Sequence, residues 1–276
     1  MSLLGLLVFN ILQNGIFSSK MGINVAIVGD NGVSLLLLRP EEQMVSWVDL
    51  PADIRVKIYD SSASYPVESL WSYGVAEKKP FETVERSLGQ SMGVVIARTI
   101  KLNNEGKIGD VLGGLLSVGV KSDLSLRDRV LIRKFLADAV KSKKVLELRL
   151  PDSVFDKTAD PDGKEFLNIN NAVMALWTKN KFVLEPILDE SADISINNVS
   201  DTEGVGLTLS RQLESAGMHV IEVKADKNST VSGSGCLYTT GKSFTMTETF
   251  LKEQVDCKKI AQTVSTDEEK IEIWMK

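Results

Sequence analysis

Short apolar runs separated by turn-forming residues dominate the first part of the chain. The segments between the runs are rich in glycine, proline, asparagine and acidic residues, a composition typical of turns between strands. The pattern therefore predicts four short strands, at residues 24–28, 34–38, 44–48 and 54–58. A further strand is predicted at residues 93–99.

Helical patterns follow these strands. Two segments begin with a proline, which suits the first turn of a helix, and stop before a glycine, which suits its end. A third segment has the clearest periodicity: Leu131, Phe135 and Ala139 recur at every fourth position, and Ser125 with Asp128 resembles a capping box. The predicted helices are residues 66–73, 80–88 and 125–140.

After the third helix the pattern becomes mixed. It predicts a buried strand at residues 145–150, a polar, turn-rich stretch at residues 152–164 and a helix at residues 168–177. Residues 185–190 are expected to belong to a linker. The whole segment 151–191 is therefore predicted to be a linker with a short helix.

The segment 192–276 has the pattern of a compact α/β unit. A helix is predicted to open at Gly204 and to end at Gly217, the position of a C′ glycine, and a second helix is predicted with Ser243 as its cap. The predicted strands are residues 194–196, 219–224, 236–239 and 270–275. Two strand–helix–strand units of this kind predict a small α/β sandwich.

The first nineteen residues carry no charged side chain. As a helix they would extend over about 30 Å, the thickness of the hydrocarbon core of a bilayer. The basic start and the small-residue cleavage site of a signal peptide are both missing. We therefore expect residues 1–19 to form a single membrane anchor; the alternative is a buried N-terminal helix.

Composition and charge argue against several classes of function. The chain has 276 residues, of which 43% are hydrophobic and 25% charged, and its formal net charge is −5. An acidic chain is unsuited to binding nucleic acid through a strongly basic domain. A single histidine, His219, and two cysteines cannot by themselves form a His/Cys zinc site, and a Ser-His-Asp hydrolase would depend on His219 alone. We predict neither a metal centre nor a nucleic-acid partner.

Two parts of the chain resemble domains of a known family. The order of residues 194–200 (ISINNVS), 204–206 (GVG) and 216–217 (AG) resembles the LytR C-terminal domain. The first part resembles, in worn form, the LytR-CpsA-Psr catalytic domain, through residues 33–38, 40–42, 45–53 (VSWVDLPAD), 68–74, 83–89 and 122–129. The resemblance covers residues 23–150 weakly and residues 192–276 more firmly.

The resemblance implies an α/β fold and a function in the cell envelope. Family members with intact motifs are membrane-anchored, extracytoplasmic phosphotransferases. With Mg²⁺, they attach a polyprenyl-pyrophosphate-linked glycopolymer to peptidoglycan. This chemistry requires arginines that neutralise the pyrophosphate and acids that hold the metal.

The sequence departs from the family at the residues that carry this chemistry. Ala52 stands where the arginine of a Pro-Arg-Asp motif belongs, although Asp53 is kept, and residues 31–34 replace an Arg-Ser-Asp-Thr signature. The loss of one arginine from a pyrophosphate clamp lowers the rate by orders of magnitude. We therefore predict that this copy is non-catalytic.

A few residues are still candidates for a site. Asp53 and Arg55 are candidate catalytic remnants, with a turn aspartate and a solvated strand arginine as the alternative. Three arginines of the predicted helix 125–140 depart from the family's Arg-x-x-Arg-Gln register but are candidates for binding phosphate or an anionic polymer, unless they form only a solvated helix face. They are Arg127, Arg129 and Arg133. No cofactor is predicted, and Mg²⁺ enters only if the protein is a transferase.

The two cysteines are predicted to be close in space. Cys236 begins a predicted strand and Cys257 follows the next predicted helix, and a strand–helix–strand unit brings such positions together. In an extracytoplasmic protein we expect them to form a disulfide. In a reducing cytosol they would be buried thiols.

The predicted organisation is thus an anchor at residues 1–19, a degenerate LytR-CpsA-Psr-like α/β domain at 23–150, a linker at 151–191 and a LytR C-terminal-like domain at 192–276. The predicted function is that of an extracytoplasmic, membrane-anchored envelope protein that binds or scaffolds a wall glycopolymer or a protein partner. Polyprenyl phosphate lipid is a further candidate ligand. The alternatives are an active glycopolymer phosphotransferase and a cytosolic α/β interaction protein.

Overall fold

The computed structural model describes residues 15–30, 32–117, 119–159, 163, 165–226, 231–261 and 270–276. Most of the predicted anchor, residues 1–14, lies outside this part of the chain. Residues 15–19, its predicted end, form a loop and not a helix. No helix within the described residues has the length and apolar character needed to cross a membrane.

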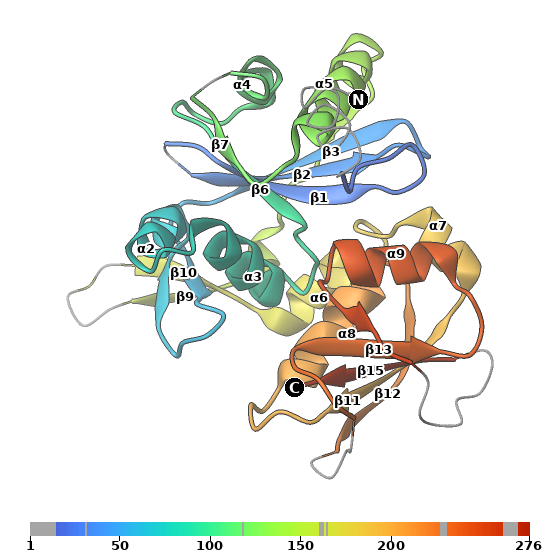
Figure 1. The fold of residues 1–276 in the computed structure, drawn as a ribbon. Coiled ribbons are helices and arrows are strands. Elements are labelled where there is room, and N and C mark those ends of the chain that lie inside the picture. Colours follow the sequence, from blue (N-terminus) through green and yellow to red (C-terminus); the bar gives the residue numbers. More distant parts are fainter. Residues whose placement is uncertain are drawn as a thin grey trace. The chain divides into compact units, whose positions relative to one another are not determined.

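The chain divides into two compact units (Figure 1). The N-terminal unit comprises residues 1–91 and 96–170, and the C-terminal unit comprises residues 92–95 and 171–276. The segment 151–191, expected to be a linker, is therefore shared between them and contains two strands and two helices.

A six-stranded mixed sheet forms the centre of the N-terminal unit. Its strands are, in spatial order, β7 (Lys121–Ser122), β6 (Arg98–Lys101), β1 (Ile23–Val28), β2 (Val33–Arg39), β3 (Met44–Leu50) and β8 (Val145–Glu147). Strands β1, β2 and β3 form an antiparallel meander, while β6 and β8 run parallel to their neighbours β1 and β3. Strands β1, β2 and β3 confirm the predicted runs, whereas β7 was not predicted. Strand β6 begins five positions later than predicted, because Arg98 is its first residue paired with β1. The prediction of a buried strand at residues 145–150 is wrong: β8 ends at Glu147, and as an edge strand its residues are half-buried or exposed.

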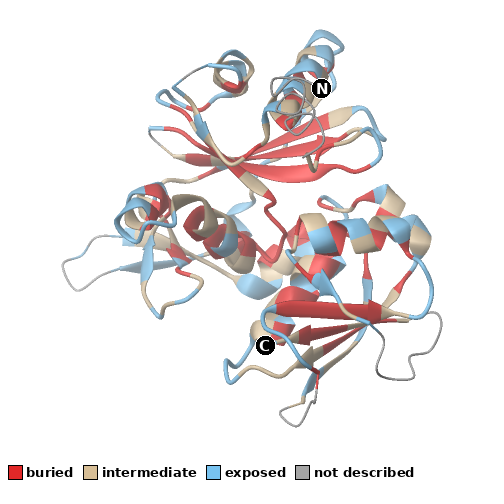
Figure 2. Cartoon of the chain, in the orientation of Figure 1, coloured by how far each residue is buried: buried red, intermediate tan, exposed pale blue. Residues whose placement is uncertain are grey.

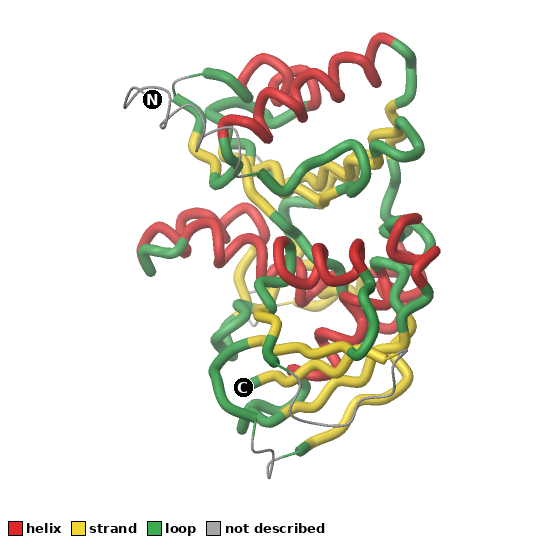
Figure 3. The backbone as a smooth tube through the Cα atoms, turned by 45° about the vertical axis from the view of Figure 1, so that its right-hand side comes forward, coloured by secondary structure: helices red, strands yellow, loops and turns green. Residues whose placement is uncertain are grey.

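Helices cover both faces of this sheet. The helices α4 (Ile108–Gly114) and α5 (Leu126–Lys141) lie on one side and α3 (Pro80–Met92) on the other (Figures 1 and 3). All six residues of β1 are buried, and Figure 2 shows the central strands as the most deeply buried part of the unit. The short α2 (Leu70–Ala76) follows a 3₁₀ turn, η1 (Val67–Ser69), where one helix was predicted. The helix α4 was not predicted.

The buried face of α5 is rotated relative to the prediction. Its fully buried apolar residues are Ile132, Leu136 and Ala139, whereas Leu131 and Phe135 are only partly buried at the edge of the same core. The helix α3 also differs, since it continues through Gly89 and stops at Gly93, whose φ is +67°. A glycine ends a helix where the backbone turns left-handed, and Gly93, which was predicted to begin a strand, takes that conformation.

A second sheet in the N-terminal unit contains a hairpin that the sequence pattern did not predict. Its order is β5 (Ser64–Pro66), β4 (Ile54–Lys57), β10 (Glu165–Ile169) and β9 (Phe155–Ala159). Strands β9 and β10 pair antiparallel where a turn-rich stretch was expected. Four of the five residues of β9 are exposed, so the strand has no apolar alternation that would identify it.

The C-terminal unit contains a five-stranded mixed sheet. Its order is β12 (His219–Ala225), β11 (Asp193–Asn198), β15 (Lys270–Met275), β13 (Cys236–Thr240) and β14 (Lys258–Lys259). Its helices are α6 (Asn171–Thr178), α7 (Glu185–Glu190), α8 (Val205–Ser215) and α9 (Thr245–Glu253). The predicted strands and the helix between Gly204 and Gly217 are confirmed, and α7 occupies the place of the expected linker.

The first turn of α9 is capped from a distant part of the chain. The carboxylate of Glu190 accepts hydrogen bonds from the backbone N–H groups of Met246 and Thr247, each at 2.8 Å. The predicted cap, Ser243, is wrong: the N-cap residue is Phe244. The N-terminus of a helix is its positive end, and here the free amides are satisfied by an anionic side chain from another helix. Sequence reasoning looks for the cap in the residue just before the helix.

The carboxylate of Asp128 attaches the loop 15–17 to the first turn of α5. It accepts hydrogen bonds from the backbone N–H groups of Ile16 (3.2 Å) and Phe17 (3.0 Å) and from the hydroxyl of Ser125 (2.8 Å). The Asp128 N–H in turn donates to Ser125 Oγ, which completes the predicted cap. Phe17 is buried, and its ring centroid lies 5.7 Å from that of Phe135.

The cysteines form the predicted disulfide. Cys236 and Cys257 are joined at a sequence separation of 21, between the first residue of β13 and the segment after α9. Both are buried. The bond closes the β13–α9–β14 unit.

We predict that Asp128→Ala lowers the free energy of unfolding by about 3 kcal/mol, because two amides and one hydroxyl lose a charged acceptor in a buried place. Asp138→Ala is the matched control, since Asp138 is an exposed aspartate on the same helix, and we expect it to cost less than about 0.5 kcal/mol. Urea denaturation measures both. Equal losses in the two variants would show that the Asp128 contacts contribute nothing specific.

We also predict that the double substitution Cys236→Ala with Cys257→Ala lowers the free energy of unfolding by about 3 kcal/mol, the value for a loop of roughly 20 residues. A reductant should lower the stability of the unsubstituted protein by a similar amount and leave the double variant unchanged. An unsubstituted protein that is insensitive to the reductant would contradict the prediction.

Candidate functional site

The predicted catalytic remnants lie in the four-stranded sheet. Asp53 is exposed in the turn before β4, and its backbone carbonyl accepts a hydrogen bond from Leu167 N–H at 3.2 Å. Arg55, on β4, stacks its guanidinium over the ring of Phe166, with Cζ 3.6 Å from the ring centroid. A cation held against an aromatic ring in this way stabilises the packing of β4 on β10.

Two of the three arginines of α5 bind the main chain of neighbouring segments. Arg129 donates to the carbonyl oxygens of Leu124 (3.2 Å) and Ser122 (3.0 Å). Arg133 donates through Nε to the carbonyl of Leu112 at 3.2 Å, which connects α5 to α4. Arg127 lies beside the loop 15–17, with an Nη atom 3.1 Å from the point where a Cβ on Gly15 would stand.

The structure places the two groups of predicted site residues on different layers. Asp53 and Arg55 belong to the four-stranded sheet, whereas the arginines belong to the helix layer over the six-stranded sheet (Figure 1). The hydrogen bonds of Arg129 and Arg133 are directed to carbonyl groups and thus support the fold around α5.

The described residues contain no cluster of acids that would hold a Mg²⁺ ion without a substrate. Mg²⁺ is bound through carboxylates and other oxygen ligands. Within the described ranges, no three or more histidine, cysteine, aspartate or glutamate side chains are arranged to hold a metal ion. Asp53 is exposed at its turn. We therefore derive no reaction step through a metal.

A half-buried acidic pair, which sequence reasoning missed, lies between α3 and the edge of the six-stranded sheet. The side chains of Glu85, on α3, and Asp123, after β7, share a hydrogen bond. Asp123 also accepts the backbone N–H of Thr99 at 2.8 Å and lies 3.6 Å from Arg98 Nε. Oε1 of Glu85 is buried and, among the described residues, meets no hydrogen-bond partner.

The environment of this pair keeps a proton on Glu85. Burial and the neighbouring charge of Asp123 raise the pKa of Glu85 to about 9. Burial also raises the pKa of Asp123, but the Thr99 amide and Arg98 oppose the shift by stabilising its charged form. The pair is thus a neutral carboxyl beside a carboxylate. An isolated glutamate in an amphipathic helix gives no sign of this partner, which is 38 positions away along the chain.

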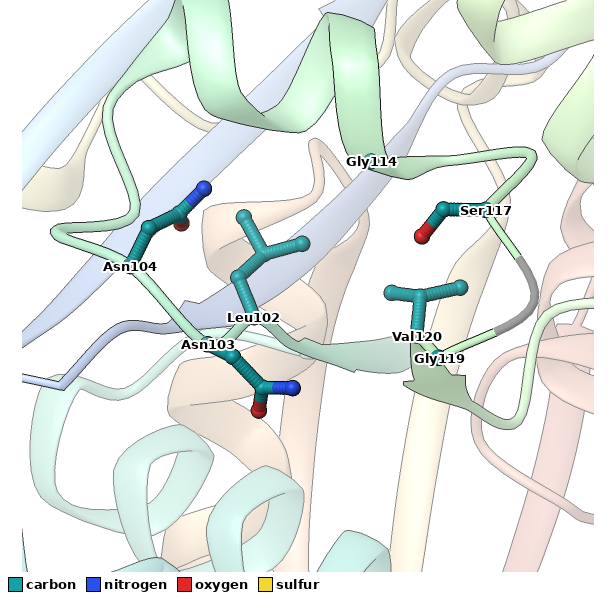
Figure 4. Close-up of a pocket in the computed structure, with 7 residues that line it drawn as sticks. All are labelled: Leu102, Asn103, Asn104, Gly114, Ser117, Gly119 and Val120. Carbon is teal, nitrogen blue, oxygen red and sulfur yellow. The ribbon is translucent and has the colours of Figure 1, made fainter.

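A hollow of about 160 Å³ opens between α4, β6 and β7 (Figure 4). Figure 4 shows the side chain of Leu102 pointing up toward α4, with Ser117 and Val120 across from it. The remaining lining residues are Asn103, Asn104, Gly114 and Gly119. Ligand pockets for drug-sized molecules measure roughly 300–1,000 Å³, so this hollow is too small for a lipid-linked glycopolymer.

Comparisons with known proteins give distant similarities of fold. No family model and no curated protein matches the chain. TagT from Bacillus subtilis has a TM-score of 0.44 at 10% identity, over 60% of this chain and 92% of that chain. TagV from the same organism has a TM-score of 0.43 at 8% identity, over 56% and 93%.

A transcriptional regulator from Enterococcus faecalis is similar to the same degree. Its TM-score is 0.43 at 12% identity, over 57% of this chain and 85% of that chain. In two further solved structures TagT is bound to LI-WTA and to LIIa-WTA. Similarities at this level carry no conclusion about a site or an activity of this chain. The LytR C-terminal domain stays a prediction.

We predict that the protein loses stability as the pH rises from about 5 to about 9. The proton on Glu85 is held in the folded state up to a pKa of about 9 and is lost in the unfolded state above 4.5. Between these values the folded state binds more protons, so each rise in pH favours unfolding. Glu85→Gln should flatten this slope and raise the free energy of unfolding at pH 8 by about 1–3 kcal/mol.

Urea denaturation at a series of pH values measures the slope. The control is Glu82→Gln, which changes a glutamate of the same helix that pairs with Arg86 at 3.3 Å and should leave the alkaline slope in place. A Glu85→Gln variant with an unchanged slope would show that the Glu85 proton does not contribute to folding.

Proposed function

We propose that the protein is an extracytoplasmic cell-envelope protein, anchored through its N-terminal apolar segment, that binds a wall glycopolymer or an envelope protein without catalysing phosphoryl transfer. The sequence resemblance to the LytR-CpsA-Psr family suggests the envelope and the glycopolymer. The observation that carries the extracytoplasmic part is the buried disulfide between Cys236 and Cys257.

Disulfides form and persist in oxidising compartments and are rare in the cytosol. The chain has two cysteines, and both are in this bond. In a cytosolic interaction protein the two cysteines would be buried thiols that only pack in the core. The bond therefore favours the exported protein over the cytosolic alternative.

The placement of the arginines supports binding without catalysis. A pyrophosphate clamp needs guanidinium groups and a metal-holding acid directed at one point. Arg129 and Arg133 donate to main-chain carbonyls around α5, and Arg55 is stacked on Phe166. The acid kept from the family motif, Asp53, lies in the other sheet, and its neighbour is Ala52 in place of an arginine.

The test uses the full chain in lipid nanodiscs. Purified cell wall that carries its anionic glycopolymer is the first probe, and a polyprenyl pyrophosphate with and without Mg²⁺ is the second. We expect the protein to sediment with the wall and to release no phosphate-containing product from the lipid in either condition. Asp53→Ala, which changes an exposed turn residue, should leave wall binding and stability unchanged.

Two results would overturn the proposal. Mg²⁺-dependent turnover that Asp53→Ala abolishes would establish the transferase. Failure to sediment with wall, together with free thiols in protein alkylated directly in the cells, would establish a protein of the cytosol.

A further inference from the structure

The loop 15–17 is attached to α5. Hydrogen bonds from Ile16 and Phe17 to Asp128, with Phe17 buried at 4% exposure, hold the loop 15–17 against the first turn of α5. The residues that precede this loop, 1–14, are uncharged and largely apolar. A membrane anchor in that segment would therefore bring the bilayer surface close to the N-terminal half of α5.

The outward face of this half of α5 is apolar with basic flanks. Leu126 and Val130 lie one helical turn apart and are 53% and 48% exposed. Arg127 and Lys134 flank them at helical spacing, and Lys134 is exposed. The buried face, Asp128, Ile132, Leu136 and Ala139, is opposite. Toward the C-terminal end the exposed residues include Asp138 as well as Lys141, so that end carries charges of both signs.

We infer that the N-terminal half of α5 lies on the membrane surface, with Leu126 and Val130 in the headgroup region and the basic side chains against anionic lipid headgroups. The inference rests on the proposed function, because it needs the anchor. Exposed apolar residues flanked by cations are the pattern of a segment that lies in a bilayer interface.

The experiment compares two variants that carry the same fluorescent reporter at different positions of α5. Val130→Cys and Val140→Cys exchange valines of similar exposure, 48% and 44%, and the native cysteines are already paired. Each full-length variant is labelled with a thiol-reactive nitrobenzoxadiazole dye. The labelled protein is reconstituted in phosphatidylcholine vesicles with and without phosphatidylglycerol. Quenching by headgroup spin-labelled lipid is then compared with quenching by aqueous iodide.

We expect lipid quenching to be several-fold stronger at position 130 than at position 140, and stronger with phosphatidylglycerol. Arg127→Gln combined with Lys134→Gln should remove the effect of phosphatidylglycerol at position 130. Flotation of the unlabelled full chain with the vesicles tests the anchor independently of α5.

Each other outcome has a distinct meaning. If the chain floats but lipid quenches both positions equally, the inference about α5 is wrong and the anchor stands. If the chain floats and position 130 is shielded from lipid and iodide alike, residues 1–14 cover α5 and the inference is again wrong. If the chain does not float, the anchor of the proposed function is wrong, and the inference fails with it.

Discussion

The N-terminal unit depends on the complete burial of its central strands. All six residues of β1 and six of the seven residues of β2 are buried, so neither face of the sheet can meet water. Apolar strands of this kind require a layer on each side. The helices α4 and α5 supply one layer and α3 lies on the other side, and Asp128, Glu85 and the arginines of α5 are located on these layers.

Two acids in this unit have different surroundings. The buried carboxylate of Asp128 accepts three hydrogen bonds, and through them it joins α5 to the loop 15–17. Glu85 has a buried oxygen without a partner among the described residues, and the charge of Asp123 is close by. A proton held on Glu85 in the folded state makes its carboxyl neutral, so that it needs no hydrogen-bond donors. The free energy of unfolding then depends on pH.

The arginines of α5 show that the same residue type can either support a fold or bind a ligand. A guanidinium that donates to carbonyl groups of its own chain stabilises a helix layer, whereas the same group directed at open space can neutralise a phosphate. In this protein Arg129 and Arg133 belong to the first kind. Residue type on a predicted helix made them candidates for the second kind, which is why function has to be argued from the site.

The sequence by itself determined the elements whose apolar pattern is local and strong. The first strands, α5, α8 and the strands of the C-terminal sheet were all predicted from periodicity, turns and glycine stops, and the disulfide followed from the order of strand and helix. The hairpin β9–β10 escaped because four of the five residues of β9 face solvent. The helix α4 was missed, and α7 was taken for a linker.

Only the tertiary structure decided which distant groups meet. The capping box at Ser125 and Asp128 was visible in the sequence, but the third task of Asp128, binding the amides of residues 16 and 17, spans more than a hundred positions. The cap of α9 by Glu190 and the pairing of Glu85 with Asp123 are of the same kind. The periodicity of apolar residues indicates which side of a segment faces the core. Hydrogen bonds and ion pairs between distant segments depend on how the segments pack, and a local sequence pattern does not show this.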